Sequence, residues 1–307
     1  MRQAGVLDVG CHSALFTVAR QRTDTVLEPV FTRKVRLSLH TTLDRTGRLS
    51  EYGVQSVQRA VAEAMAADRR PRRPEVFAFA TSVIRDAPNR DEVIAEVDRT
   101  TGVRLRVLPG EEEARLAYVA ARRWAGPGAG PLLVLDIGGG TVEIASGSAE
   151  QPRTVCSLPI GARRITRDWL PGGFAASPQQ LDRVRVHLRR FLSTVPGLPQ
   201  AEPGGLVLAC SKTFAQLARL AGALSTPTSL GGQLTRPGVQ ACVPVLSGTG
   251  PAGREELPGI SQHRAEQSLA GALIAEALLD ACGAGQAKVC PWSTREGLLL
   301  ERLGADR

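Results

Sequence analysis

The segment Asp136-Ile137-Gly138-Gly139-Gly140-Thr141 combines a carboxylate, three consecutive glycines and a hydroxyl group directly after an aliphatic stretch. Glycines let a backbone approach a ligand closely, and the amide groups of such a turn can point toward that ligand. Glu143 follows two residues after Thr141, so both side chains lie on one face of the expected next strand. Phosphate oxygens bind such donors, and a divalent cation binds flanking carboxylates. The pattern predicts a phosphate-binding hairpin; the alternative is a glycine-rich turn that binds nothing.

A related segment, Asp8-Val9-Gly10-Cys11-His12-Ser13, stands near the N-terminus. The largely aliphatic segment 5–10 recurs as residues 133–138, and both segments end in Asp-x-Gly. The copies are too far apart for a solenoid repeat, so they indicate two similar halves that each begin with a β-hairpin. Two such hairpins facing each other would clamp phosphates. A lone histidine such as His12 is by itself more often structural.

Two further groups can act on phosphate chemistry. Arg85 follows an expected strand at residues 75–80, and its guanidinium group suits phosphate or carboxylate; a structural ion pair is the alternative. Glu113 belongs to the segment Gly110-Glu111-Glu112-Glu113-Ala114-Arg115 at an expected helix start. Acids at this position are favoured by the helix macrodipole alone. A carboxylate beside a phosphate site would also serve as a general base that deprotonates water.

The elements that position these residues alternate between strands and helices, which predicts an α/β protein. A Gly/Pro-rich segment at residues 124–131 separates the halves and predicts domains 1–125 and 126–307. Periodicity predicts strands at 5–10, 14–18, 75–80, 103–108, 133–138, 141–144, 206–210 and 287–290. It predicts helices at 53–67, 91–101, 111–123, 178–193, 213–221, 265–281 and 295–303, and a loop with some short structure at 222–259.

Composition narrows the class of protein. The chain has 307 residues, of which 43% are hydrophobic and 22% charged, so wholesale disorder is excluded. The net charge of +8 is compatible with a polyanionic partner, although a bias toward arginine over lysine is also what GC-rich codon usage produces. The six cysteines form no Cys-x-x-Cys pair and the four histidines show no ligand spacing with them, so no zinc site is expected. The absence of a long apolar run or a signal-like N-terminus predicts a cytoplasmic protein without membrane partners.

The four chemical segments, in this order, resemble the exopolyphosphatase and guanosine pentaphosphate phosphohydrolase family. The resemblance covers nearly the whole chain, through residues 5–18, 79–89, 108–120, 133–147, 157–162 and 295–299. It corresponds to the short form of the family, without an additional C-terminal helical domain. It implies the duplicated, ribonuclease H-like α/β fold of actin, sugar kinases and heat-shock chaperone ATPases, with two domains around a cleft.

The resemblance also implies an activity: magnesium-dependent cleavage of a terminal phosphate from inorganic polyphosphate or from pppGpp. Carried over by position, Glu113 is the catalytic base. Asp136 and Glu143 take the catalytic carboxylate positions near the metal and water, and both are the implied metal ligands. The phosphate-binding positions are Asp8, Gly10, Cys11, His12, Arg85, Gly138, Gly139, Gly140 and Thr141. The implied partners are polyphosphate or guanosine penta- or tetraphosphate, together with a second copy of the chain in a homodimer, and no nucleic acid.

The first hairpin departs from the family pattern Asp-x-Gly-Ser-Asn-Ser/Thr, because Cys11 and His12 replace its Ser-Asn pair. Cysteine is a poor donor to phosphate, and histidine is bulkier and changes charge with pH. We therefore expect slower catalysis or a changed substrate preference. A degenerate member that senses (p)ppGpp or polyphosphate with little turnover is the main alternative. A sugar or acetate kinase on the same fold is a third alternative. Adenosine-binding kinases usually carry a glycine-rich nucleotide motif in the second half, and residues 208–213 lack its paired glycines.

Overall fold

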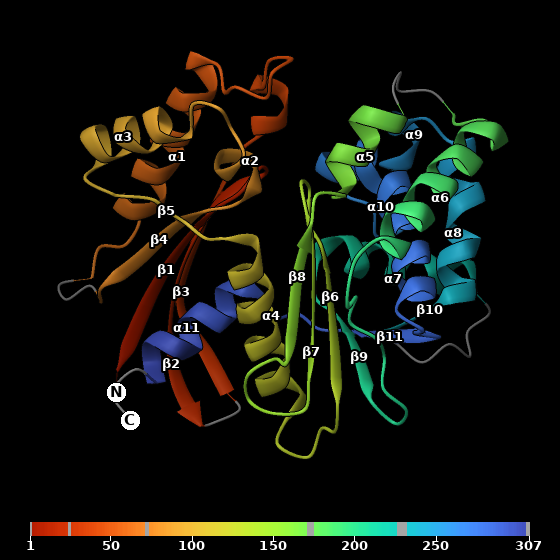
Figure 1. Cartoon of the computed structure of the whole chain (residues 1–307). Helices are drawn as coiled ribbons and strands as arrows, with labels where there is room; N and C mark the ends of the chain where they lie inside the picture. The colour runs from red at the N-terminus through yellow and green to blue at the C-terminus, as the bar shows by residue number, and fades with distance from the viewer. Residues whose placement is uncertain (1, 24–25, 71–73, 171–174, 226–231, 305–307) are drawn as a thin grey trace. The chain divides into compact units, whose positions relative to one another are not determined.

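The computed structural model describes residues 2–23, 26–70, 74–170, 175–225 and 232–304 (Figure 1). The chain divides into two compact units: unit 1 comprises Met1–Glu112 and Arg295–Arg307, and unit 2 comprises Glu113–Thr294. The C-terminal helix therefore belongs to the same unit as the N-terminal hairpin. The domain boundary between residues 125 and 126, which was inferred from the internal repeat and the Gly/Pro-rich segment, stays a prediction.

Unit 1 is built on a five-stranded sheet with the order β3-β2-β1-β4-β5. The strands β1 (Gln3–Val9), β2 (Ser13–Thr23) and β3 (Val26–Arg36) form an antiparallel meander. The strands β4 (Val76–Ala80) and β5 (Arg106–Val107) add to β1 in parallel. Its helical segments are η1 (Leu39–Thr42), α1 (Glu51–Ala66), α2 (Ser82–Arg85), α3 (Arg90–Thr101) and most of α11 (Thr294–Gly304).

The sheet of unit 1 is covered on both faces. Alternation along β1 directs Leu7 and Val9 into a core that also contains Val57 and Val61 of α1. Phe77 alternates with the core residues of β4, and the guanidinium carbon of Arg302 in α11 lies 4.7 Å from its ring centroid. Helices α1 and α3 thus cover one face, and α11 contacts the other.

Unit 2 repeats this plan with a six-stranded sheet in the order β10-β11-β9-β6-β7-β8. The strands β6 (Leu132–Ile137), β7 (Val142–Gly147) and β8 (Thr154–Leu158) form the antiparallel meander. The strands β9 (Leu206–Ala209) and β11 (Gln286–Val289) continue from β6 in parallel, and β10 (Gln233–Thr235) closes the edge. Each sheet therefore places the first strand of its hairpin at the centre, with the meander on one side and parallel strands on the other. This repetition confirms the predicted duplicated α/β fold.

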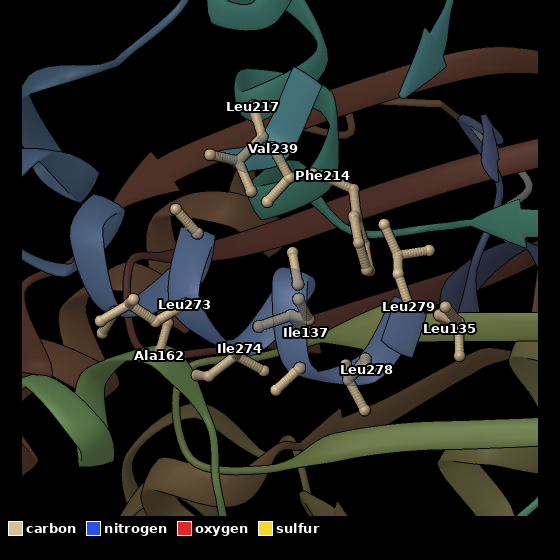
Figure 2. Close-up of a cluster of buried hydrophobic side chains, with 14 of the residues drawn as sticks. Leu135, Ile137, Ala162, Phe214, Leu217, Val239, Leu273, Ile274, Leu278 and Leu279 are labelled. Atoms are coloured by element: carbon tan, nitrogen blue, oxygen red, sulfur yellow. The ribbon is translucent and has the colours of Figure 1, made fainter. Parts of the chain in front are cut away.

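The core of unit 2 lies between its sheet and a layer of helices (Figure 2). Leu135 and Ile137 of β6 contact this core, which includes Phe214 of α7 (Lys212–Leu224) and Leu273 of α10 (Gln262–Ala281). The alternate residue Val134 faces the opposite layer, where it packs with residues of α4 (Gly110–Ala125). Alternating burial along β6 therefore fixes both faces of the sheet, and with them the position of the turn that follows Ile137.

Most of the predicted strands and helices occur in the structure. Helix α6 (Pro178–Ser193) has the predicted bounds, whereas five elements were missed: β3, η1, α2, β8 and α5 (Ala162–Trp169). The prediction of a loop with some short structure at 222–259 was wrong where the 13-residue helix α8 (Arg236–Gly248) occurs. The short elements β10 and α9 (Pro251–Arg254) agree with it, and residues 226–231 lie outside the described residues. The glycine and proline content of this segment led to the prediction of a loop in place of α8. Its apolar residues nevertheless follow helical spacing and are buried: Val239, Cys242, Val243 and Leu246.

Candidate active site

The second predicted hairpin places two carboxylates opposite each other. The register of β6 and β7 pairs Asp136 with Glu143, and side chains of such a pair project from the same face. The turn between them is closed by the amide of Gly138, which donates to the carbonyl oxygen of Thr141 at 2.9 Å. The Glu143 Oε2 atom lies 3.8 Å from the point where a Cβ on Gly138 would stand. The Glu143 carboxylate thus reaches the first glycine of the turn.

The start of α5 holds one side of the glycine turn. The carbonyl oxygens of residues 138–140 accept hydrogen bonds from backbone amides of residues 161–164 at 2.9–3.1 Å. In a trans peptide unit the N–H points opposite to the C=O, so the amides of residues 139–141 point away from α5. Consecutive amides with a common direction form an anion-binding concavity. The turn therefore presents a row of donors of the kind that a phosphate group requires.

Gly161 is what allows α5 to approach the turn so closely. A Cβ at this position would lie 2.4 Å from the carbonyl carbon of Gly140 and from the backbone nitrogen of Thr141. No side chain fits there, so any replacement would displace the turn or the helix. The sequence contains this glycine in the motif Ser157-Leu158-Pro159-Ile160-Gly161, but its role is visible only in the packed structure.

Two serines orient the carboxylates. The Ser293 hydroxyl donates to Asp136 Oδ2 at 2.5 Å, and the Ser157 hydroxyl donates to Glu143 Oε1 at 3.0 Å. Ser157 lies directly opposite Glu143 in the β7–β8 register. Sequence reasoning assigned no role to either serine. Ser157 follows from the strand β8 that was missed, whereas Ser293 is distant from Asp136 along the chain.

Glu113 lies in the same unit as this hairpin. It is 8% exposed, whereas its neighbour Glu112 is half-buried and Glu111 is exposed. Its carbonyl oxygen accepts a hydrogen bond from the Thr294 hydroxyl at 3.3 Å. Thr294 directly follows Ser293, which holds Asp136. Two consecutive residues thus connect the backbone of the predicted base to the side chain of a predicted metal-side acid.

Arg163 is a further candidate that the sequence analysis missed. Its Nε and Nη1 atoms are buried and have no hydrogen-bond partner among the described residues. The Nε atom lies 3.7 Å from the point where a Cβ on Gly139 would stand. A buried polar group without a partner costs free energy, and a guanidinium group fits phosphate oxygens in bidentate geometry. Arg163 therefore lies beside the glycine turn with the chemistry of an anion ligand.

The remaining predicted residues belong to unit 1. The first hairpin is closed like the second, by the amide of Gly10 donating to the Ser13 carbonyl oxygen at 2.9 Å. Asp8 lies in β1 before this turn, and Cys11 and His12 lie within it. Arg85 ends α2 and has the ion pair that the sequence left open as an alternative: its Nε donates to Asp86 at 3.1 Å, and its Nη1 donates to the Leu108 carbonyl oxygen at 3.3 Å.

The predicted magnesium site can be tested against the donor set. In the described part of the chain, Glu113, Asp136 and Glu143 do not form a group of three with ligand atoms within 4.8 Å of one another. Mg²⁺ does not require such a cage, because it usually binds one or two carboxylates and completes its shell with water and substrate phosphate. The opposed pair Asp136 and Glu143, beside a phosphate-type turn, fits that mode of binding.

No helix in the described residues is both long and apolar enough to cross a bilayer.

Comparisons with known proteins find related sequences over nearly the whole chain. The model of the Ppx/GppA phosphatase family matches residues 17–305. The Exopolyphosphatase 1 of Mycobacterium tuberculosis is 38% identical over 311 residues, which cover 98% of this chain and 88% of the relative. The protein of the same name from Mycobacterium leprae is 38% identical over 98% of this chain and 90% of its own. An uncharacterized protein of Streptomyces coelicolor is 40% identical with the same coverage.

Solved structures confirm the fold class. The crystal structure of the Aquifex aeolicus member of the Ppx/GppA family has a TM-score of 0.81 at 27% identity, with 99% of each chain covered. An exopolyphosphatase from Cytophaga hutchinsonii has a TM-score of 0.84 at 18% identity, over 100% of this chain and 99% of its own, which shows the fold alone. The resemblance identified from the sequence motifs is confirmed.

Proposed function

We propose that this chain, which belongs to the Ppx/GppA phosphatase family, is an exopolyphosphatase that releases terminal orthophosphate from inorganic polyphosphate. Family membership makes it a phosphoanhydride hydrolase. The observation that carries the specific proposal is the glycine turn of unit 2. It combines a row of backbone amides, the opposed carboxylates Asp136 and Glu143, and a connection through Ser293 and Thr294 to the buried Glu113.

The reaction follows from what these groups can do. The amides of residues 139–141 and the guanidinium group of Arg163 bind the oxygens of the terminal phosphate. Glu113 orients a water molecule and accepts its proton as the water oxygen attacks phosphorus. The phosphoanhydride bond breaks, orthophosphate leaves, and the polymer is one phosphate shorter. Magnesium held by Asp136 and Glu143 would neutralise charge on the phosphate oxygens.

Unit 1 supplies further anion-binding groups in this proposal. Its hairpin has the same closure as the catalytic one, and we assign Asp8, Gly10, Cys11 and His12 to the binding of additional phosphates. Arg85 is assigned the same role, with its bonds to Asp86 and Leu108 holding the guanidinium group in place. Hydrolysis of pppGpp, a cytoplasmic location and a homodimeric state belong to the same proposal.

A sensor that binds polyphosphate or (p)ppGpp with little turnover is the second candidate. The observation that favours it is the Cys11-His12 pair in the first hairpin, since neither side chain matches the Ser-Asn pair of the family. The two candidates differ in one assay: release of orthophosphate from long-chain polyphosphate with magnesium. Sustained release supports the hydrolase. Tight binding of polyphosphate without release would replace it by the sensor.

A further inference from the structure

The first hairpin brings together three side chains that ligate transition metals. Cys11 and His12 come from the β1–β2 turn, and His40 comes from η1. One ligand atom from each lies within 4.8 Å of the other two, and this is the one such group of three or more Cys, His, Asp or Glu residues in the described ranges. The Cys11 Sγ atom lies 3.7 Å from His40 Nδ1, and the ring centroids of His12 and His40 are 5.2 Å apart.

Backbone hydrogen bonds hold the two contributing segments together. The amide of Leu39 donates to the Cys11 carbonyl oxygen at 3.0 Å, and the amide of Leu37 donates to the His12 carbonyl oxygen at 2.9 Å. The Leu39 side chain is fully buried in the core of unit 1, which anchors η1 beside the hairpin. His40 therefore reaches the turn because the backbone places it there, and the cluster does not depend on a chance contact between surface side chains.

The distances suit a zinc ion. Zinc binds cysteine sulfur at about 2.3 Å and histidine nitrogen at about 2.0–2.1 Å, so tetrahedral geometry separates sulfur and nitrogen ligands by about 3.5 Å. The observed separation of Cys11 Sγ and His40 Nδ1 is 3.7 Å. The other pairs need to close from at most 4.8 Å, which is within the reach of side-chain rotation. Thiolate and imidazole ligands select zinc over magnesium, which prefers oxygen.

We propose that Cys11, His12 and His40 bind one zinc ion. On binding, the thiol of Cys11 loses its proton to solvent and its sulfur forms the bond to the metal. Three protein ligands leave one tetrahedral position open, as in zinc sites that bind water or substrate. That position takes a phosphate oxygen, an extension that rests on the proposed function of this hairpin. The Cys11-His12 pair then replaces the donors of the family pattern by a cation.

Other cysteines of the chain provide a contrast. Burial raises the pKa of the Cys242 thiol to about 11 and that of the Cys282 thiol to about 12, so both stay protonated in the core of unit 2. Cys156 is half-buried in the same unit and belongs to no ligand group of the described residues. His263 is exposed. Cys156 and His263 are therefore suitable positions for control substitutions.

The test uses the full chain, stripped of metal with a chelator and titrated with Zn²⁺ by calorimetry. We expect one zinc ion per chain. Cys11→Ser and His40→Gln should each weaken zinc binding by at least about 100-fold, more than the loss of an outer-shell partner costs. Cys156→Ser and His263→Gln should bind zinc like the wild type. Absence of stoichiometric binding, or unchanged binding by His40→Gln, would overturn the proposal.

Cobalt gives a readout that needs no variant. In wild-type protein loaded with Co²⁺, a thiolate ligand produces a charge-transfer band, and its absence would overturn the assignment of Cys11. Inorganic phosphate should then alter the cobalt spectrum, and an unchanged spectrum would refute the open phosphate position. Hydrolysis of polyphosphate is measured separately. Zinc binding without hydrolysis would refute the proposed hydrolase function and support the zinc site. Hydrolysis without zinc binding would refute the zinc site and support the hydrolase function.

Discussion

Replacing Glu113 by glutamine removes the basicity of the proposed catalytic group and nearly keeps its shape. The side chain belongs to a buried residue, 8% exposed, so bulk water has little access to take over its role. The Thr294 hydroxyl contacts the carbonyl oxygen of residue 113 and not its side chain, so the substitution leaves that contact in place. The expected effect is therefore chemical, on the removal of the water proton.

The size of the effect follows from general-base catalysis. Such groups contribute about 10²–10⁴-fold to the rate, which corresponds to about 2.7–5.4 kcal/mol in activation free energy at about 1.36 kcal/mol per decade. Turnover of Glu113→Gln on long-chain polyphosphate should fall by this factor. Binding of polyphosphate should persist or become tighter, because one negative charge leaves the site. An inactive protein that still binds its substrate is the expected phenotype.

Glu112→Gln is the matched control, one residue away on the same helix. Its side chain is half-buried, and because it is not assigned to the reacting groups, turnover should stay close to that of the wild type. The assay is orthophosphate release at saturating polyphosphate and magnesium, with thermal unfolding of each variant to verify folding. If Glu113→Gln keeps most of the turnover, or Glu112→Gln is the more damaging change, the base is assigned wrongly.

Three further predictions concern magnesium, the first hairpin in unit 1 and Arg163 in unit 2. A magnesium chelator should abolish orthophosphate release, and added magnesium should restore it. The physical reason is that the carboxylates of Asp136 and Glu143 repel the negative phosphate oxygens unless a cation lies between them. Full activity in excess chelator would contradict this prediction. Cys11→Ser combined with His12→Asn, assayed without zinc, should raise release by restoring hydroxyl and amide donors, and an equal or lower rate would indicate that the native pair suits another substrate. Arg163→Met should lower kcat/KM by about 10–100-fold through loss of a charged hydrogen bond worth ~1.5–3 kcal/mol. It should also raise the unfolding temperature, because it removes buried nitrogens without partners, and a variant that loses stability and keeps activity would show a structural role.

Local sequence was sufficient for the elements that the chain builds from neighbouring residues. Strand alternation and the repeated Asp-x-Gly ending predicted two similar halves, and the structure repeats the same strand order in both sheets. Thr141 and Glu143 are two residues apart, so strand alternation was enough to predict that they share a face, whereas the pairing of Asp136 with Glu143 came from the register of β6 and β7. Where proline and glycine interrupt a pattern, as in α8, the same reasoning failed, because packing of its buried apolar face outweighs their local preference.

Only the tertiary structure decided which distant residues join these segments. Ser293 contacts Asp136 across 157 positions of the chain, Arg163 lies beside Gly139 because α5 packs on the turn through Gly161, and His40 reaches Cys11 through the anchoring of η1. Periodicity and motif spacing describe a residue and its near neighbours along the chain. Distances between remote side chains are set by how buried elements pack against one another, and that information appears only once the whole core is assembled.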